Sequence, residues 1–215
     1  MGKRIGQDQK TADDIFGSFT GIHQTEIQAF FQERHRFEGG AKVSDHPLVL
    51  MAFTNRCGSN LTADYLRQAN VVRGLGEYLN YDVVVRHARN RKLDTFPEYI
   101  RWLHNRKART RGIFGTKASG DQIALLLRWG IDRMFSGLRI IHVVREDVVA
   151  QAVSYSIASQ TKRWTSKQRG LDVVPVFKPE DIYRRIQGIM RSNEKIRLIA
   201  QVAEIPSLTV RYGDM

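Results

Sequence analysis

The sequence predicts a three-layer α/β protein in which a mostly parallel central sheet is flanked by helices. Residues 48–53 and 138–144 are short, nearly continuous apolar runs that suit strands buried on both faces of a sheet. Segments with apolar residues at helical spacing alternate with such runs along the chain. The composition, 42% hydrophobic and 26% charged over 215 residues, is that of an ordinary globular domain.

The N-terminal residues 1–46 are polar and mixed, and we interpret them as a helical extension. Within them, a helix is predicted over residues 26–37, and Gly39-Gly40 ends it. The first strand follows at 48–53, and a polar turn over 54–60 leads into the next helix.

The remaining elements continue the alternation of strands and helices. Asp147 is predicted to cap one of the helices, whose apolar face would carry Val148, Val149, Ala152, Val153 and Ile157. The expected elements are a strand at 112–117, a helix at 122–135, a strand at 138–144, a helix after 147, a helix at 179–202 and a strand at 207–211.

Residues 84–111 are rich in arginine and lysine, and we interpret them as a helical insertion with one basic face. Two interpretations of that face stay open: a solvated helix surface, or a surface for an anionic acceptor. The chain as a whole carries a net charge of +12, which favours anionic partners. Nucleic acid, nucleotide, acidic glycan and anionic membrane all fit that charge.

Several classes of protein are disfavoured by what the sequence lacks. The single cysteine, Cys57, allows no intramolecular disulfide, and the N-terminus has no apolar stretch typical of a signal peptide. No apolar run approaches the roughly 18 residues that a membrane span requires. The six histidines show no metal-ligand spacing, so no metal is expected, and His142 is interpreted as a core residue. A cytoplasmic protein is predicted.

The turn after the first strand has the chemistry of a phosphate-binding loop. A helix N-terminus presents backbone N–H groups and a partial positive charge to an anion. Gly58 lets the backbone come close, Ser59 and Asn60 offer hydrogen bonds, and Arg56 adds a forked positive charge. The Gly-x-x-x-x-Gly-Lys-Ser/Thr pattern is absent, and Ala63 stands where a cysteine-dependent phosphatase would have arginine. A polar turn without a ligand is the alternative.

The segment Thr54-Asn55-Arg56-Cys57-Gly58-Ser59-Asn60-Leu61 resembles the 5′-phosphosulfate loop of sulfotransferases that use 3′-phosphoadenosine 5′-phosphosulfate (PAPS). The closest subgroup is the Stf0 type, which is trehalose 2-sulfotransferase-like. The resemblance implies a P-loop-like fold over residues 47–215, truncated at the C-terminal end. It assigns donor contacts to Arg56, Cys57, Gly58, Ser59, Asn60 and Leu61. Cys57 and Asn60 replace the usual Ser and Thr, and a thiol is a weak donor.

Residues 143–154 resemble the segment that binds the donor's 3′-phosphate in the same family. The order is Arg at a strand end, Asp two residues later, then Gln-Ala-Val-Ser on the helix. The resemblance therefore implies that Arg145 and Ser154 bind the 3′-phosphate. Two anion sites suit PAPS and its product adenosine 3′,5′-bisphosphate (PAP), whereas a nucleotide kinase needs no second site. A surface arginine beside an ordinary capped helix is the alternative.

The stretch Gly74-Leu75-Gly76-Glu77-Tyr78-Leu79 resembles the part of the family that carries a glutamate base. The resemblance implies that Glu77 is the general base and that Arg56 stabilises the charge of the phosphosulfate as its S–O bond breaks. A loop carboxylate paired with Arg73 is the alternative for Glu77. Lys117 matches a Gly-x-Lys segment that recurs in the subgroup, and it either holds charge near the sulfuryl group or is a solvated lysine.

The sequence therefore predicts a PAPS-dependent sulfotransferase that transfers a sulfuryl group to a hydroxyl acceptor. The resemblance implies a carbohydrate or glycolipid acceptor, without metal. The alternative from another class is an inactive polyanion or nucleic-acid binding module on the same fold, which the charge of +12 favours.

Overall fold

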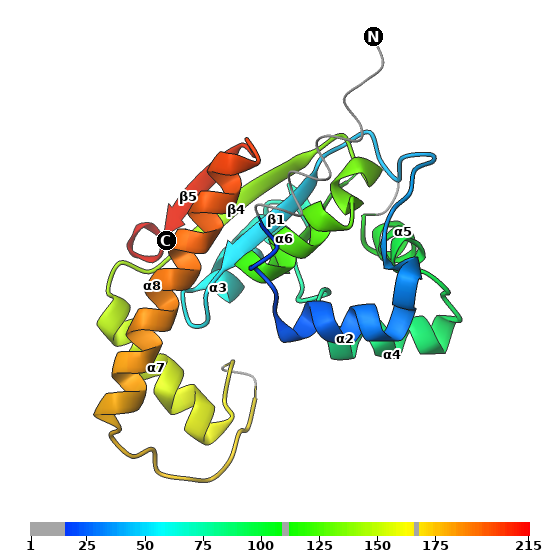
Figure 1. Cartoon of the computed structure of the whole chain (residues 1–215). Coiled ribbons are helices and arrows are strands. Elements are labelled where there is room, and N and C mark those ends of the chain that lie inside the picture. Colours follow the sequence, from blue (N-terminus) through cyan, green and yellow to red (C-terminus); the bar gives the residue numbers. More distant parts are fainter. Residues whose placement is uncertain (1–15, 109–111, 166–167) are drawn as a thin grey trace.

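The computed structural model describes residues 16–108, 112–165 and 168–215, and a parallel sheet lies at its centre. Within these residues the sheet has five strands in the order β2-β3-β1-β4-β5, and every neighbouring pair is parallel. Helices lie on both of its faces (Figure 1), so the predicted three-layer α/β fold is confirmed. The strands are β1 (Leu48–Phe53), β2 (Val72–Gly74), β3 (Ile113–Ala118), β4 (Leu138–Val144) and β5 (Ser207–Arg211).

The helices connect the strands in the alternating order that the sequence predicts. Before β1 and between β1 and β3 lie α2 (Ile22–Phe31), α3 (Ser59–Gln68), α4 (Tyr81–Arg91) and α5 (Phe96–Lys107). After β3 come α6 (Gly120–Arg128), α7 (Val148–Thr161) and α8 (Pro179–Val202). Short 3₁₀ helices are η1 (Gln32–His35), η3 (Ile131–Met134) and η4 (Tyr212–Asp214).

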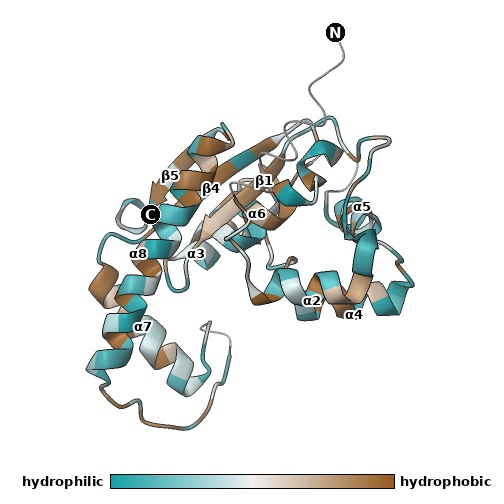
Figure 2. Cartoon of the chain, viewed as in Figure 1, coloured by the Kyte–Doolittle hydropathy of each residue, from teal (hydrophilic) through white to brown (hydrophobic). Residues whose placement is uncertain are grey.

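The central strand β1 is buried on both faces because its side chains alternate between two hydrophobic clusters. Leu48, Leu50 and Ala52 belong to the larger cluster, which helices α2, α4, α5, α6 and α8 complete. Val49 and Met51 belong to a second cluster on the opposite face, beneath α3. Figure 2 shows β1 in tan, the colour of apolar residues, which suits a strand with both faces in hydrophobic clusters.

Trp129 lies at the centre of the larger cluster and is 1% exposed. The Phe96 ring meets it edge-on at a centroid distance of 5.2 Å, and the His35 ring lies 4.7 Å away. We expect Trp129→Ala to lower the free energy of unfolding by about 3–5 kcal/mol, because the truncation leaves a cavity in a packed core. Urea denaturation measures this loss. Trp164→Ala, which removes a half-buried ring, is the control; equal losses for both variants would contradict the prediction.

The helix predicted at 122–135 is wrong as a single element. The structure ends α6 at Arg128 and begins the separate turn η3 at Ile131. Between them Gly130 has a φ of +67°, a left-handed conformation that ends helices readily at glycine. The apolar spacing continues across this break, which explains why the pattern alone suggests a longer helix.

Three further expectations differ from the structure. The helix predicted at 26–37 begins earlier, at Ile22, and continues from residue 32 as the 3₁₀ helix η1. The short strand β2 has no apolar run and was not predicted. On α7, Val149 and Ile157 are 59% and 42% exposed, so the predicted apolar face is buried only in part.

Helices α4 and α5 occupy residues 84–107 of the segment that we interpret as a basic insertion, while residues 109–111 lie outside the described part. Their apolar side chains, such as Val84 and Leu103, are buried. Most of the basic side chains are exposed, as a solvated helix face requires. The description of these helices as an insertion stays a prediction, as do the other proposed domain boundaries.

Candidate functional site

The carboxyl edge of the sheet brings the predicted site segments together. β1 lies between β3 and β4, with Ala52 opposite Ala118 and Phe53 opposite Val143. The loops that leave these three strands therefore begin side by side. The chain passes from β1 toward β2 on one side and later crosses to β4 on the other, and parallel α/β sheets bind ligands at such a reversal.

The loop after β1 is a tight turn that ends at the first residue of α3. Arg56 and Gly58 both have positive φ, at +66° and +95°. A Cβ on Gly58 would stand 2.4 Å from the Tyr212 ring. Position 58 therefore requires glycine for two reasons, the positive φ and the close contact with this ring. Ser59 then begins the helix, which leaves the first backbone N–H groups of α3 without intrahelical partners, as at every helix start.

Arg56 is held by two residues from distant parts of the chain. Its Nε donates to the Ser154 hydroxyl at 3.0 Å, and Nη1 donates to the Trp164 carbonyl at 2.5 Å. The loop itself is supported by Gln151 of α7, whose side chain is fully buried and donates to the Thr54 hydroxyl and the Asn55 carbonyl, each at 2.8 Å. α7 thus fixes both the loop and its arginine.

Cys57 occupies the middle of the loop but points into the protein. Its side chain is fully buried in the second hydrophobic cluster. Burial raises the pKa of the thiol, and hydrogen bonds from Ser59 and Thr54 oppose that rise. Any donor contact from this residue must therefore come from its backbone. Leu61, one turn further, is half exposed on the surface of α3.

Lys117 reaches the loop from the neighbouring strand β3. Its side chain is 3% exposed, and its ammonium donates to the Ser59 hydroxyl at 3.4 Å and to the Asn60 side-chain oxygen. Burial lowers the pKa of Lys117, whereas the negative charge of Glu77 raises it in opposition. The expectation of a solvated lysine is wrong, because the strand places this side chain between the loop and Glu77.

Arg145 leaves the end of β4 and lies over the ring of Tyr212, with its guanidinium carbon 5.0 Å from the ring centroid. The same ring packs against Gly58, so Tyr212 connects the arginine to the loop. Among the described residues, Ser154 is hydrogen-bonded to Arg56 rather than to Arg145. The predicted cap of α7 is confirmed, since the Ala150 N–H donates to the Asp147 carboxylate at 2.8 Å.

Glu77 follows β2 in a turn that is anchored on β3. The carbonyl of Gly76 accepts hydrogen bonds from the Lys117 N–H at 2.9 Å and the Thr116 hydroxyl at 3.0 Å. The Glu77 carboxylate accepts from the Asn80 side chain at 3.2 Å. The alternative role predicted for Glu77 is an ion pair with Arg73. Among the described residues, these two side chains form no ion pair.

A cavity of about 390 Å³ lies beside Glu77 and reaches the loop after β1. Thr54 and Asn55 line one wall, and Glu77 and Asn80 line another. The remaining wall comes from the start of α6 and from α7 and α8, with Asp121, Tyr155 and Arg185. The cavity therefore extends from Glu77 to the first two residues of the loop after β1.

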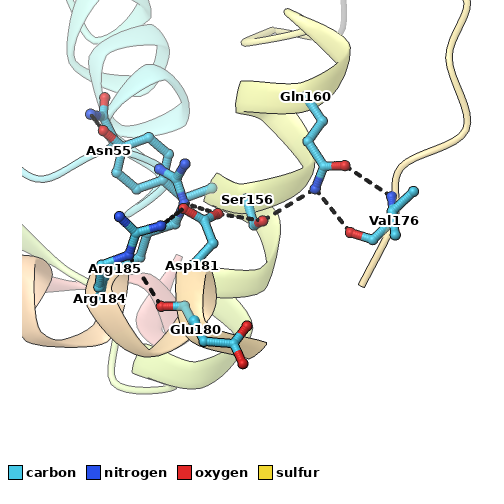
Figure 3. A network of polar contacts seen from close by, with 9 residues as sticks. Asn55, Ser156, Gln160, Val176, Glu180, Asp181, Arg184 and Arg185 are labelled. Atoms are coloured by element: carbon cyan, nitrogen blue, oxygen red, sulfur yellow. Dashed lines mark hydrogen bonds and ion pairs between the residues drawn. The ribbon is translucent and has the colours of Figure 1, made fainter. Parts of the chain in front are cut away.

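Sequence patterns did not identify Tyr155 and Arg185, which are placed by contacts between α7 and α8. The guanidinium of Arg185 lies over the Tyr155 ring at 4.1 Å, and Tyr155 accepts from the Asn55 side chain at 2.9 Å. Figure 3 shows Asp181 beside them, accepting from the Ser156 hydroxyl and from Arg185 Nε, each at 2.7 Å. The bonds from Arg185 and Ser156 lower the pKa of Asp181. No motif in either segment signals this arrangement.

A comparison with models of protein families identifies the family of this chain. The model of the Stf0 sulphotransferase family matches residues 49–215, which include both strand-end loops, Glu77 and Lys117. The chain belongs to the Stf0 sulphotransferase family. A search of curated proteins found no significant match.

Membership of the Stf0 sulphotransferase family confirms the predicted resemblance and supports sulfotransferase activity. It also implies a nucleotide donor and an acceptor substrate. Among the described residues, no group of His, Cys, Asp and Glu is arranged to hold a metal ion. No helix in the described ranges is long and apolar enough to cross a membrane. His142 is buried and hydrogen-bonded to Asn193 at 3.2 Å, as a core histidine should be.

Proposed function

We propose that this Stf0 family member transfers a sulfuryl group from PAPS to a hydroxyl group of a carbohydrate or glycolipid. The observation that carries the proposal is the cavity of about 390 Å³, which is lined by Glu77 and by Thr54 and Asn55, the two residues that precede Arg56 in the loop after β1. A transferase needs a donor site and an acceptor site that open onto each other, because the two reacting atoms must approach in line.

The donor's 5′-phosphosulfate fits the loop after β1. The start of α3 offers N–H groups and the helix dipole, and Gly58 leaves room for close approach of the backbone. Arg56 and Lys117 add two positive charges from different sides of the loop. Lys117 is buried without an acidic partner within ion-pair distance among the described residues, and an anion at the loop would offset the cost of that burial.

The donor's 3′-phosphate is assigned to Arg145 and to Ser154, whose hydroxyl accepts a hydrogen bond from Arg56. Arg145 emerges at the carboxyl end of β4 beside β1, where it lies over the Tyr212 ring, and no carboxylate of the described residues forms an ion pair with it. Its guanidinium donors are therefore available to a phosphate. PAP, which keeps this phosphate, should bind much better than a nucleotide that lacks it.

The acceptor is assigned to the cavity beside Glu77. The acceptor oxygen forms a bond to sulfur while the bond between sulfur and the bridging phosphate oxygen breaks, which releases PAP. The hydroxyl proton passes to the Glu77 carboxylate, which Asn80 orients. Arg56 and Lys117 stabilise the charge that builds up on the leaving phosphate.

The charges of the cavity favour a neutral acceptor over an acidic one. Asp121 is paired with Lys195 and Arg185 is paired with Asp181, so among the described residues of the lining Glu77 is the charged side chain without an ion-pair partner. None of the basic residues of α5 lines this space. Polar groups alternate with the rings of Phe53 and Tyr155, a combination that suits sugar hydroxyls and sugar faces.

Calorimetric titration with PAP, with 5′-AMP as the control ligand, tests the donor assignment. We expect PAP to bind tightly and 5′-AMP weakly, because only PAP can engage Arg145. Arg145→Ala should weaken PAP binding by about 10- to 100-fold, as expected for a lost hydrogen bond between charged groups. Arg139→Ala, on the same strand but near its beginning, is the matched control and should bind PAP normally.

Equal binding of PAP and 5′-AMP would overturn the assignment of a 3′-phosphate site. It would favour the alternative of an inactive polyanion-binding module, which the net charge of +12 supports. That alternative predicts binding to unrelated polyanions, with an affinity that falls steeply as the salt concentration rises.

A further inference from the structure

The loop that joins α7 to α8 carries an exposed apolar segment. We call residues 171–177 the apolar loop; it has no regular secondary structure and lies at the bottom of Figure 1 in gold. Val174 is 89% exposed and Phe177 is 77% exposed. The other large apolar side chains of the loop are also exposed, namely Leu171, Val173 and Val176. So much adjacent apolar surface on one loop indicates a partner.

The backbone of the apolar loop is fixed at several points, so its side chains are held away from the protein. The Gln160 amide of α7 donates to the Val176 carbonyl at 3.0 Å and accepts from the Val176 N–H at 2.9 Å (Figure 3). The Leu171 N–H donates to the Thr161 carbonyl at 2.6 Å. After the loop, Asp181 ties the start of α8 to Ser156 of α7.

Basic residues flank the apolar loop in the sequence. Residues 162–178 contain five basic residues and one acidic residue, a net charge of +4: Lys162, Arg163, Lys167, Arg169 and Lys178 against Asp172. Lys167 lies outside the described residues, and the other four are exposed. Exposed apolar side chains flanked by Lys and Arg are the pattern of segments that insert shallowly into a bilayer and bind its anionic headgroups.

We infer that the apolar loop docks the protein on an anionic phospholipid surface. Val174 and Phe177 enter the interface between headgroups and acyl chains, and the flanking basic residues contact the anionic headgroups. A second copy of the chain is a poorer partner, because each copy carries the same flanking basic residues and a net charge of +12. Nucleic acid would attract the basic residues but would leave the aliphatic side chains exposed to water.

The position of the loop gives this docking a consequence for the proposed function. α7 and α8, which the loop connects, supply Tyr155 and Arg185 to the cavity beside Glu77. Docking would therefore hold these helices, and the cavity that they line, close to the membrane surface. If the proposed function holds, this arrangement suits a glycolipid whose headgroup carries the acceptor hydroxyl. The docking itself does not depend on that function.

Co-sedimentation of the purified chain with lipid vesicles tests the inference. We expect the chain to bind vesicles of phosphatidylcholine with about 30% phosphatidylserine and to bind pure phosphatidylcholine far more weakly. The double variant Val174→Asp/Phe177→Asp should lose binding by at least about tenfold. Lys178→Glu should lose it by at least about fivefold, the factor expected for one basic residue near an anionic surface.

Val71→Asp is the matched control, since Val71 is 55% exposed and lies just before β2, at the opposite edge of the sheet. It should bind like the unmodified chain. In addition, the fluorescence of Phe177→Trp should shift to shorter wavelength on anionic vesicles. Calorimetry with PAP on the double variant reports folding and the donor site independently of lipid binding.

Three results would overturn the inference. One is equal binding to both kinds of vesicle, or to neither. Another is anionic binding that the double aspartate variant retains in full. The third is a dimer in light scattering that the aspartate variant abolishes while vesicle binding is absent, which would assign the apolar loop to a second copy of the chain.

Discussion

Glu77→Gln is expected to lower kcat by about 10²- to 10⁴-fold, the range for loss of a general base. Glutamine keeps the size of the side chain and its hydrogen bond with Asn80, but it cannot take the acceptor proton. PAP affinity should change little, because the loop after β1 does not use the Glu77 carboxylate. The measurement is the rate of PAP release from PAPS with a panel of neutral disaccharides, including trehalose, at saturating donor.

Asp121→Asn is the informative control for this prediction, since Asp121 is the other carboxylate that lines the cavity. Asp121 forms an ion pair with Lys195 at 2.6 Å and should affect acceptor binding more than the chemical step. A large loss of kcat in Asp121→Asn, together with near-normal turnover in Glu77→Gln, would move the base to Asp121. The proposed donor site would survive that result.

Arg56→Ala is expected to lower kcat by about 10²- to 10³-fold, as for other preorganised donors that face developing charge. The Ser154 hydroxyl and the Trp164 carbonyl hold the guanidinium in position before any substrate arrives. Arg56→Lys should recover only a small part of the loss, because an ammonium keeps the charge but not the forked geometry. Steady-state rates and PAP titration together separate the effect on turnover from the effect on binding.

Arg67→Ala provides the matched control for Arg56. Arg67 lies in the last turn of α3, at the end of the helix away from the loop, and it is exposed and paired with Asp64. Its removal changes the net charge by the same amount as Arg56→Ala. If both variants lose the same activity, the effect is one of overall charge, and the specific role of Arg56 is wrong.

The strands were predictable where an apolar run is bounded by polar turns. β1, β4 and β5 lie at the predicted residues. β1 and β4 are recognised by their apolar runs, and β5 by apolar positions that end at Arg211. β2 leaves no such signal, since three residues that include an arginine pair with β3 only through the surrounding fold. The apolar spacing predicts one helix over residues 122–135, but the left-handed conformation of Gly130 ends α6 before η3 begins.

The candidate site was predictable in its sequence-local parts and not in its contacts. The loop around Gly58 and the strand end at Arg145 have spacings that a sequence shows directly. The burial of Lys117 depends on β3 lying next to β1, which spacing along the chain does not reveal. The cavity wall of Tyr155 and Arg185 likewise arises from the packing of α7 against α8.

Cys57 gives this family member a built-in reporter of its donor loop. It is the one cysteine in the sequence, and its side chain is fully buried at the start of α3. A thiol reagent can react with the native chain only when this loop opens, so the alkylation rate measures the free energy of that local opening. A nucleotide that closes the loop would slow the reaction, and no engineered label would be needed to follow it.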